Sequence, residues 1–139
     1  MAECTIEIPM PPSVNRLWRV VKGRGDQGKS TVVCSTNYKR WLRLAVPLMR
    51  IGLPAFAGPV KVTITIRGGK GWLNRRDIGN TAKATHDAVV HARRIPDDSC
   101  SHVVHEEIVY LLPLPGLEAC CWVTIKDVDI KDYTIDEVD

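Results

Sequence analysis

Residues 60–67 read VKVTITIR, in which valine or isoleucine alternates with a more polar residue at every step. Such alternation, rich in β-branched side chains, is typical of a β-strand with one buried face. A glycine-rich turn at residues 68–71 follows, and a helical pattern then extends over about residues 78–93, where Pro96 bars its continuation. This change from a strand to a helix predicts that the helix packs against the sheet that holds the strand.

Further patterns on both sides of this stretch complete the expected domain. Strands are predicted over residues 4–8, 17–22, 31–34, 103–112 and 119–130, with 17–22 and 31–34 paired as a hairpin, and a first helix over about residues 37–52. Ser35 or Thr36 is expected to cap that helix. The order predicts one small domain over residues 1–139 of the α/β (α+β) class, with two main helices packed on a mixed sheet. The tail over residues 127–139 is acidic, and we expect it to be partly disordered.

Length and composition fit one globular domain. The chain has 139 residues, of which 45% are hydrophobic and 25% are charged, and these values exclude a disordered or fibrous chain. No run reaches the roughly 18 apolar residues that cross a bilayer, so no membrane association is expected. Prolines at positions 9, 11 and 12 interrupt the apolar stretch that a signal peptide needs, and five scattered cysteines favour a reducing compartment. We therefore expect a cytoplasmic protein.

The charges are divided unevenly along the chain. Residues 1–94 carry 17 lysines and arginines against 5 acidic residues, whereas residues 95–139 carry 2 against 11. The first part therefore has a net charge of +12 and the second a net charge of −9, which together give the +3 of the whole chain. This division indicates a surface that binds a polyanion beside a metal-binding cluster or an acidic tail, unless the two signs mix on the folded surface.

A phosphate-binding spelling occurs at residues 23–30, GRGDQGKS, which match GxxxxGK[ST]. That loop requires a helix that begins at its lysine, because the backbone N–H groups of the helix hold the phosphates. Thr31, Val32 and Val33 follow Lys29 here, and they are poor residues with which to begin a helix. We interpret the segment as a flexible basic loop and expect no nucleotide cofactor.

Cys100, His102 and His105 are residue types that bind zinc. The two histidines face opposite sides if they lie on a strand, and no second pair of ligands follows at the spacing of zinc sites. These residues are therefore interpreted as surface or packed side chains.

Carboxylates gather around the second predicted helix. Asp77 lies where the helix begins, and Asn80, Lys83 and Asp87 share one helical face. Asp98 lies in the loop that returns the chain to the sheet. Oxygen ligands of this kind bind Mg²⁺, which polarises a phosphodiester and activates water. The alternative is a capped helix with ion pairs on its surface.

Three blocks of the chain resemble the RusA-like Holliday-junction resolvases, a family of endodeoxyribonucleases from bacteria and their phages. The first block is PPSVNRLWR at residues 11–19, which is similar to the opening PPSxNR signature of the family. The second is RDIGNTAKATHDA at residues 76–88, against the pattern R-D-x-D-N-x-x-K with a following D-A. The third is IPDD at residues 95–98. Their order and spacing also fit, and the likeness covers nearly the whole chain.

The resemblance implies a cytoplasmic homodimer that binds four-way DNA junctions and nicks two strands symmetrically with Mg²⁺, or with Mn²⁺ as a substitute. Asp77 and Asp98 would be metal-binding and catalytic carboxylates, with Asp97 as a further candidate ligand. Lys83 would be the catalytic lysine, and its charge would stabilise the phosphate as water attacks. The residues expected to contact DNA are Asn15, Arg16, Arg19, Lys39, Arg40, Arg75, Arg76 and Asn80.

One position departs from the family pattern. Gly79 stands where the family has its second metal-binding aspartate. The loss of one carboxylate lowers the negative charge around a cation and leaves a coordination position to water or to another side chain, for which Asn80, Asp87 and Asp97 are candidates. The alternative function is therefore a weakened or inactive protein that still binds branched DNA.

Overall fold

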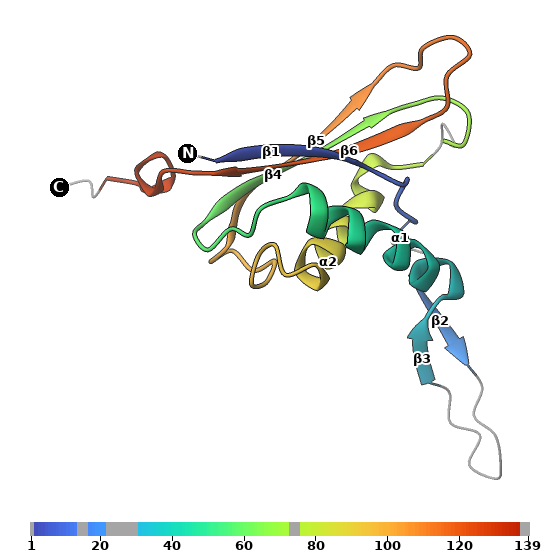
Figure 1. Cartoon of the computed structure of the whole chain (residues 1–139), viewed down its shortest axis with the longest axis horizontal. Coiled ribbons are helices and arrows are strands. Elements are labelled where there is room, and N and C mark those ends of the chain that lie inside the picture. Colours follow the sequence, from blue (N-terminus) through green and yellow to red (C-terminus); the bar gives the residue numbers. More distant parts are fainter. Residues whose placement is uncertain (1, 14–16, 22–30, 73–75, 137–139) are drawn as a thin grey trace.

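The computed structural model describes residues 2–13, 17–21, 31–72 and 76–136 (Figure 1). In chain order the elements are β1 (Glu3–Ile8), β2 (Trp18–Val21), β3 (Thr31–Cys34), α1 (Thr36–Gly52), β4 (Val60–Arg67), the 3₁₀ helix η2 (Ile78–Thr81), α2 (Ala82–His91), β5 (Val103–Leu111), β6 (Cys120–Asp127) and the 3₁₀ helix η3 (Ile130–Tyr133). Within the described residues, four strands form a sheet in the order β1-β6-β4-β5, and β2 pairs with β3. The predicted mixed sheet with two main helices is confirmed.

Strand β4 lies inside the sheet and pairs on both sides. It is antiparallel to β6 and parallel to β5. A parallel pair cannot be joined by a tight turn, so the chain must cross over one face of the sheet between the two strands. This crossover contains η2 and α2, and α1 covers the same face of the sheet beside α2 (Figure 1).

The core lies between this sheet face and the two helices. Alternate residues of β4 are fully buried, as the sequence pattern predicts, and they meet apolar residues of both helices. Each such side chain contributes roughly 1.5–3 kcal/mol when it is removed from water. The main buried side chains are Val60, Val62, Ile64 and Ile66 of β4, Cys121, Val123 and Ile125 of β6, Tyr38, Trp41, Ala45 and Met49 of α1, and Ala84, Ala88 and Val89 of α2.

Helix α1 begins where the sequence predicts. The Ser35 side chain accepts a hydrogen bond of 3.1 Å from the backbone N–H of Tyr38, which satisfies a donor of the first turn. The helix ends after Gly52, where the backbone N–H of Leu53 closes the last turn on Met49. Among the residues that the structure describes, no helix has the length and apolar character needed to cross a membrane.

Two predicted boundaries are wrong. The helix predicted over residues 78–93 begins as the 3₁₀ helix η2, and its α-helical part covers only Ala82–His91. Glycine and asparagine at positions 79 and 80 disfavour the α-helix, which explains the tighter first turn. The strand predicted to reach residue 130 ends at Asp127, because the Asp129 side chain accepts a hydrogen bond from the N–H of Lys131 and caps η3.

The hairpin of β2 and β3 is confirmed, and Figure 1 shows it extending from the start of α1, away from the sheet. Residues 23–30, which carry the phosphate-loop spelling, lie outside the described residues. The residues that follow them form strand β3. The helix that a phosphate-binding loop requires is therefore replaced by a strand at this position.

The central strand gives a test of the packing. Ile64→Ala removes a fully buried side chain and should lower the free energy of unfolding by about 2–5 kcal/mol. Thr65→Ala, on the opposite face of the same strand, should cost about 1 kcal/mol or less. Urea denaturation measures both values, and equal losses would contradict the assignment of the buried face.

Candidate functional site

An ion pair lies on the exposed side of α2. Lys83 Nζ is 3.0 Å from Asp87 Oδ1, one helical turn away, so the predicted shared face brings these two side chains together. The other oxygen of the same carboxylate, Oδ2, accepts a hydrogen bond of 2.6 Å from the hydroxyl of Tyr38 on α1. The carboxylate of Asp87 therefore joins the two helices and the lysine.

The charge on Lys83 is stabilised by acidic neighbours. The hydrogen bond to Asp87 is the largest cause that raises the pKa of Lys83, and the charge of Asp98 raises it further. Asp98 is exposed in the loop after α2, so the electrostatic effect links that loop to the lysine on the helix. Lys83 is consequently a fixed positive charge at neutral pH.

Asp77 has a structural role at the start of η2. Its Oδ1 accepts a hydrogen bond of 2.8 Å from the N–H of Gly79, and its backbone carbonyl accepts another from the N–H of Asn80. The residue is exposed, as the predicted role of a ligand requires. Both the capping and the predicted metal-binding role would use its carboxylate.

Gly79 itself does not need to be glycine. Its φ angle lies outside the positive region that favours glycine in this chain at Gly69, Gly71 and Gly116. A Cβ atom built on Gly79 would lie 3.3 Å from Oδ1 of Asp77, so that exposed carboxylate would have to move by a few tenths of an ångström. An aspartate fits at this position with a small adjustment.

The return loop contains the other predicted ligands. Oδ1 of Asp97 accepts a hydrogen bond of 2.8 Å from the N–H of Ser99, and the hydrogen bonds to Ser99 lower the pKa of Asp97. Asp97 is thus engaged in its own turn, whereas Asp98 is the carboxylate that acts on Lys83.

The donor chemistry of Asp77 and Asp98 suits a hard cation. Mg²⁺ commonly binds one or two protein carboxylates and completes its shell with water and substrate phosphate oxygens. Over the described ranges, His, Cys, Asp and Glu side chains form no group of three or more that could hold a metal ion by themselves. Asp77 and Asp98 are both exposed and have oxygen donors of the kind that Mg²⁺ binds.

Arg76 binds the proline-rich segment, residues 9–12, to the rest of the site. Its Nη2 donates a hydrogen bond to the carbonyl of Pro11, and its guanidinium lies 4.8 Å from the ring centre of Trp72. Trp41 of α1 holds the same segment through a bond of 2.8 Å from Nε1 to the carbonyl of Pro9. Arg76 was predicted to contact DNA, and the structure gives it a local anchoring role.

The other residues predicted to contact DNA are described to different extents. Lys39 and Arg40 are exposed on α1, and Asn80 is partly exposed in η2. Arg19 lies on β2, and its side chain is outside the description. Asn15, Arg16 and Arg75 lie outside the described residues.

Three histidines have local side-chain partners. Nε2 of the buried His86 on α2 lies 2.7 Å from a carboxylate oxygen of Glu106 on β5, and this pair ties the helix to the sheet. His102 lies 3.7 Å from Asp97, and His105 bonds the hydroxyl of Tyr133. The pairing of His86 with Glu106 and of Tyr38 with Asp87 is not apparent from the sequence. The only signal for these pairs is that a polar group on a buried helix face requires a partner.

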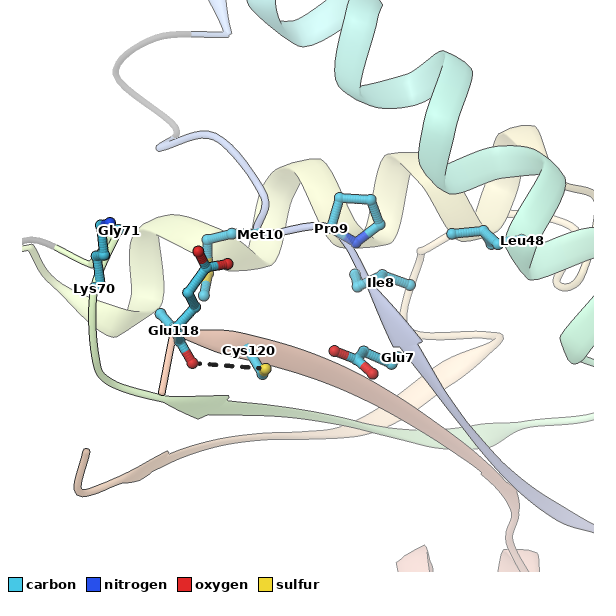
Figure 2. A pocket seen from close by; sticks show the side chains of 10 residues that line it. Glu7, Ile8, Pro9, Met10, Leu48, Lys70, Gly71, Glu118 and Cys120 are labelled. Atoms are coloured by element: carbon cyan, nitrogen blue, oxygen red, sulfur yellow. Dashed lines mark hydrogen bonds between the residues drawn. The ribbon is translucent and has the colours of Figure 1, made fainter. Parts of the chain in front are cut away.

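A cavity of about 590 Å³ lies elsewhere, at the end of β1 and the start of β6. Figure 2 shows Leu48 of α1 on one side of it and Lys70 with Gly71 on the other. Burial raises the pKa of the Cys120 thiol, and the neighbouring Glu7 raises it further, so the thiolate is disfavoured. Among the described residues, none of the predicted site residues lines this cavity.

Comparison with known proteins does not identify this site. No protein-family model matches the chain, and a search of curated proteins finds no match.

The capping role of Asp77 can be separated from its charge. Asp77→Asn keeps an oxygen that accepts from the N–H of Gly79, so the free energy of unfolding should change little. Asp77→Ala removes that acceptor and should cost about 1 kcal/mol. Thermal unfolding followed by circular dichroism measures both. Equal losses in the two variants would show that the charge, and not the cap, stabilises η2.

Proposed function

We propose that this chain is a Mg²⁺-dependent, structure-selective endonuclease of the RusA-like type that nicks four-way DNA junctions. The observation that supports it most is the meeting of the three similar blocks around α2. Arg76 of the second block donates a hydrogen bond to the carbonyl of Pro11 in the first, 65 residues away along the chain. The charge of Asp98 in the third block raises the pKa of Lys83 in the second.

The proposed roles follow from the chemistry of each side chain. Asp77 and Asp98 would hold Mg²⁺, which when bound would polarise the scissile phosphate and lower the pKa of a bound water. The ammonium of Lys83 would stabilise the negative charge that develops on the phosphate oxygens. Because the acidic neighbours raise its pKa, Lys83 would keep that charge at the pH of the cell.

Binding of the DNA backbone would use the basic residues of the first part of the chain. Lys39 and Arg40 are exposed on α1, and Arg43 and Arg50 are exposed further along the same helix. Contacts of this kind release counterions, so binding should weaken steeply with salt. The proposal includes a cytoplasmic homodimer, because paired nicks need two active sites.

Gly79 favours a second candidate function, a junction-binding protein with weak or no cleavage. Glycine has no side chain that could bind a metal, and the backbone N–H of Gly79 donates to Asp77, so the turn has one carboxylate where the resembled family has two. With fewer ligands, a cation would be bound less tightly, while the basic surface would remain.

The first experiment compares this chain with its Gly79→Asp and Gly79→Ala variants on a labelled synthetic four-way junction, with Mg²⁺ or Mn²⁺. We expect all three to bind the junction and Gly79→Asp to cut faster, since it adds a carboxylate beside Asp77. Gly79→Ala adds only the Cβ atom and controls for the stiffer backbone.

The outcomes separate the candidates. Paired symmetric nicks by the unchanged chain support the nuclease, and cleavage by Gly79→Asp alone supports the binding protein. If none of the three proteins cuts the junction or prefers it to linear duplex, both proposed functions are wrong.

The proposed metal-binding role of Asp98 and the proposed catalytic role of Lys83 predict different effects on cleavage and on junction binding. Asp98→Asn should abolish cleavage and leave junction binding in low salt intact or tighter, because it removes a ligand and a negative charge. Lys83→Ala should lower the cleavage rate by about 100-fold with a smaller effect on binding, since its charge is assigned to the transition state. Asp129→Asn, in the cap of η3, is the control. Unchanged cleavage by Asp98→Asn would remove Asp98 from the site, and a loss confined to binding would make Lys83 a phosphate clamp.

A further inference from the structure

The hydroxyl of Tyr38 and the ammonium of Lys83 meet the same carboxylate from two different helices. Tyr38 Oη is 2.6 Å from Asp87 Oδ2, and Lys83 Nζ is 3.0 Å from Asp87 Oδ1. Each oxygen of the carboxylate thus has its own donor, one from α1 and one from α2. A carboxylate held in this way has one preferred orientation about its terminal torsion.

The tyrosine is the rigid member of this chain of contacts. Only 2% of its surface is exposed, and its ring packs against Trp41 with the ring centres 6.4 Å apart. Its backbone N–H is bound by the Ser35 cap, so the residue is fixed at the first turn of α1. Burial, followed by the contact with Asp87, raises the pKa of Tyr38, so the hydroxyl remains a donor at any pH the cell reaches.

The lysine, by contrast, needs to be held. Its side chain is 48% exposed, whereas the side chain of Asp87 is 20% exposed. A free lysine loses about 2 kcal/mol of rotamer entropy when it is fixed, and an exposed ion pair by itself contributes little toward that cost. A carboxylate already oriented by a buried hydroxyl offers the ammonium a single fixed acceptor.

We propose that Tyr38 is a positioning residue for Lys83, acting through the carboxylate of Asp87. The inference rests on the proposed function for the use of the lysine, but the positioning itself is a property of the fold. Through Tyr38, α1 then determines where the ammonium of Lys83 lies, although α1 carries no proposed metal ligand. Loss of the hydroxyl alone should free the carboxylate to rotate, and the lysine should follow it.

The direct test is NMR relaxation of the lysine Cε groups in the full chain, without DNA or metal. In the unchanged protein, the order parameter of Lys83 Cε should exceed that of Lys39, which is exposed on α1. Tyr38→Phe should lower the Lys83 value toward that of Lys39 while the backbone amides of α2 keep theirs. Tyr133→Phe also removes a tyrosine hydroxyl bond, to His105 in the C-terminal segment, and should leave Lys83 unchanged.

Cleavage kinetics on a four-way junction provide the second readout, in the Gly79→Asp background if only that variant cuts. Tyr38→Phe should lower kcat about tenfold with little change in KM, because positioning affects the transition state. In a Lys83→Ala background the same change should have no effect on kcat, since the group it positions is gone.

The order parameter of Lys83 and the cleavage kinetics test the positioning role and the proposed function separately. An unchanged Lys83 order parameter in Tyr38→Phe, or additive effects on kcat in the double variant, would overturn the positioning role. If the order parameter falls as expected and no variant cuts DNA, the positioning role stands and the proposed nuclease function fails.

Discussion

The parallel pairing of β4 with β5 is the constraint on which the rest of the molecule depends. Because two parallel neighbours cannot be joined by a hairpin, the chain between them must cross one face of the sheet, and η2, α2 and the return loop are that crossing. The crossing therefore runs from the carboxyl end of β4 back to the amino end of β5, and α2 within it packs on the core that contains Ile64. Every residue proposed for metal binding or charge stabilisation lies in this one connection, so the candidate site is a product of the topology.

Some contacts around α2 hold the helix in place, and others orient the side chains on its exposed face. His86 pairs with Glu106 and fixes the helix to β5, while Arg76 fastens the proline-rich segment near its beginning. On the outer face, Asp87 orients Lys83 and is itself held by α1. Lys83 is thus an exposed charge held by a partly buried carboxylate, which is itself held by a buried tyrosine. That is the feature expected of a site which must keep a charge in place before its substrate arrives.

The sequence predicted what depends on local periodicity. The alternation over residues 60–67 located β4, and Ser35 was one of two predicted caps, because both signals depend on a few adjacent residues. The shared face of Lys83 and Asp87 followed from helical spacing. The bond between Tyr38 and Asp87 could not be predicted, since it spans 49 residues and no local pattern encodes it. The late start of the α-helical part, at Ala82 and not at Ile78, was missed because Gly79 and Asn80 weaken the first turn in favour of 3₁₀ geometry.

The outer strands of the sheet have a consequence for the behaviour of the protein at high concentration. Within the described residues, β1 and β5 form the two edges of the sheet, and an open edge is a template on which another copy can add its own strand. Glu3 and Glu7 are exposed on β1 and lie on the same side of it. If two copies met antiparallel with Thr5 facing Thr5, Glu3 of each would face Glu7 of the other, and like charges directly opposite each other destabilise a strand pair. The side chains of Glu3 and Glu7 thus disfavour this pairing of two copies along β1 and help to keep the edge from acting as a template.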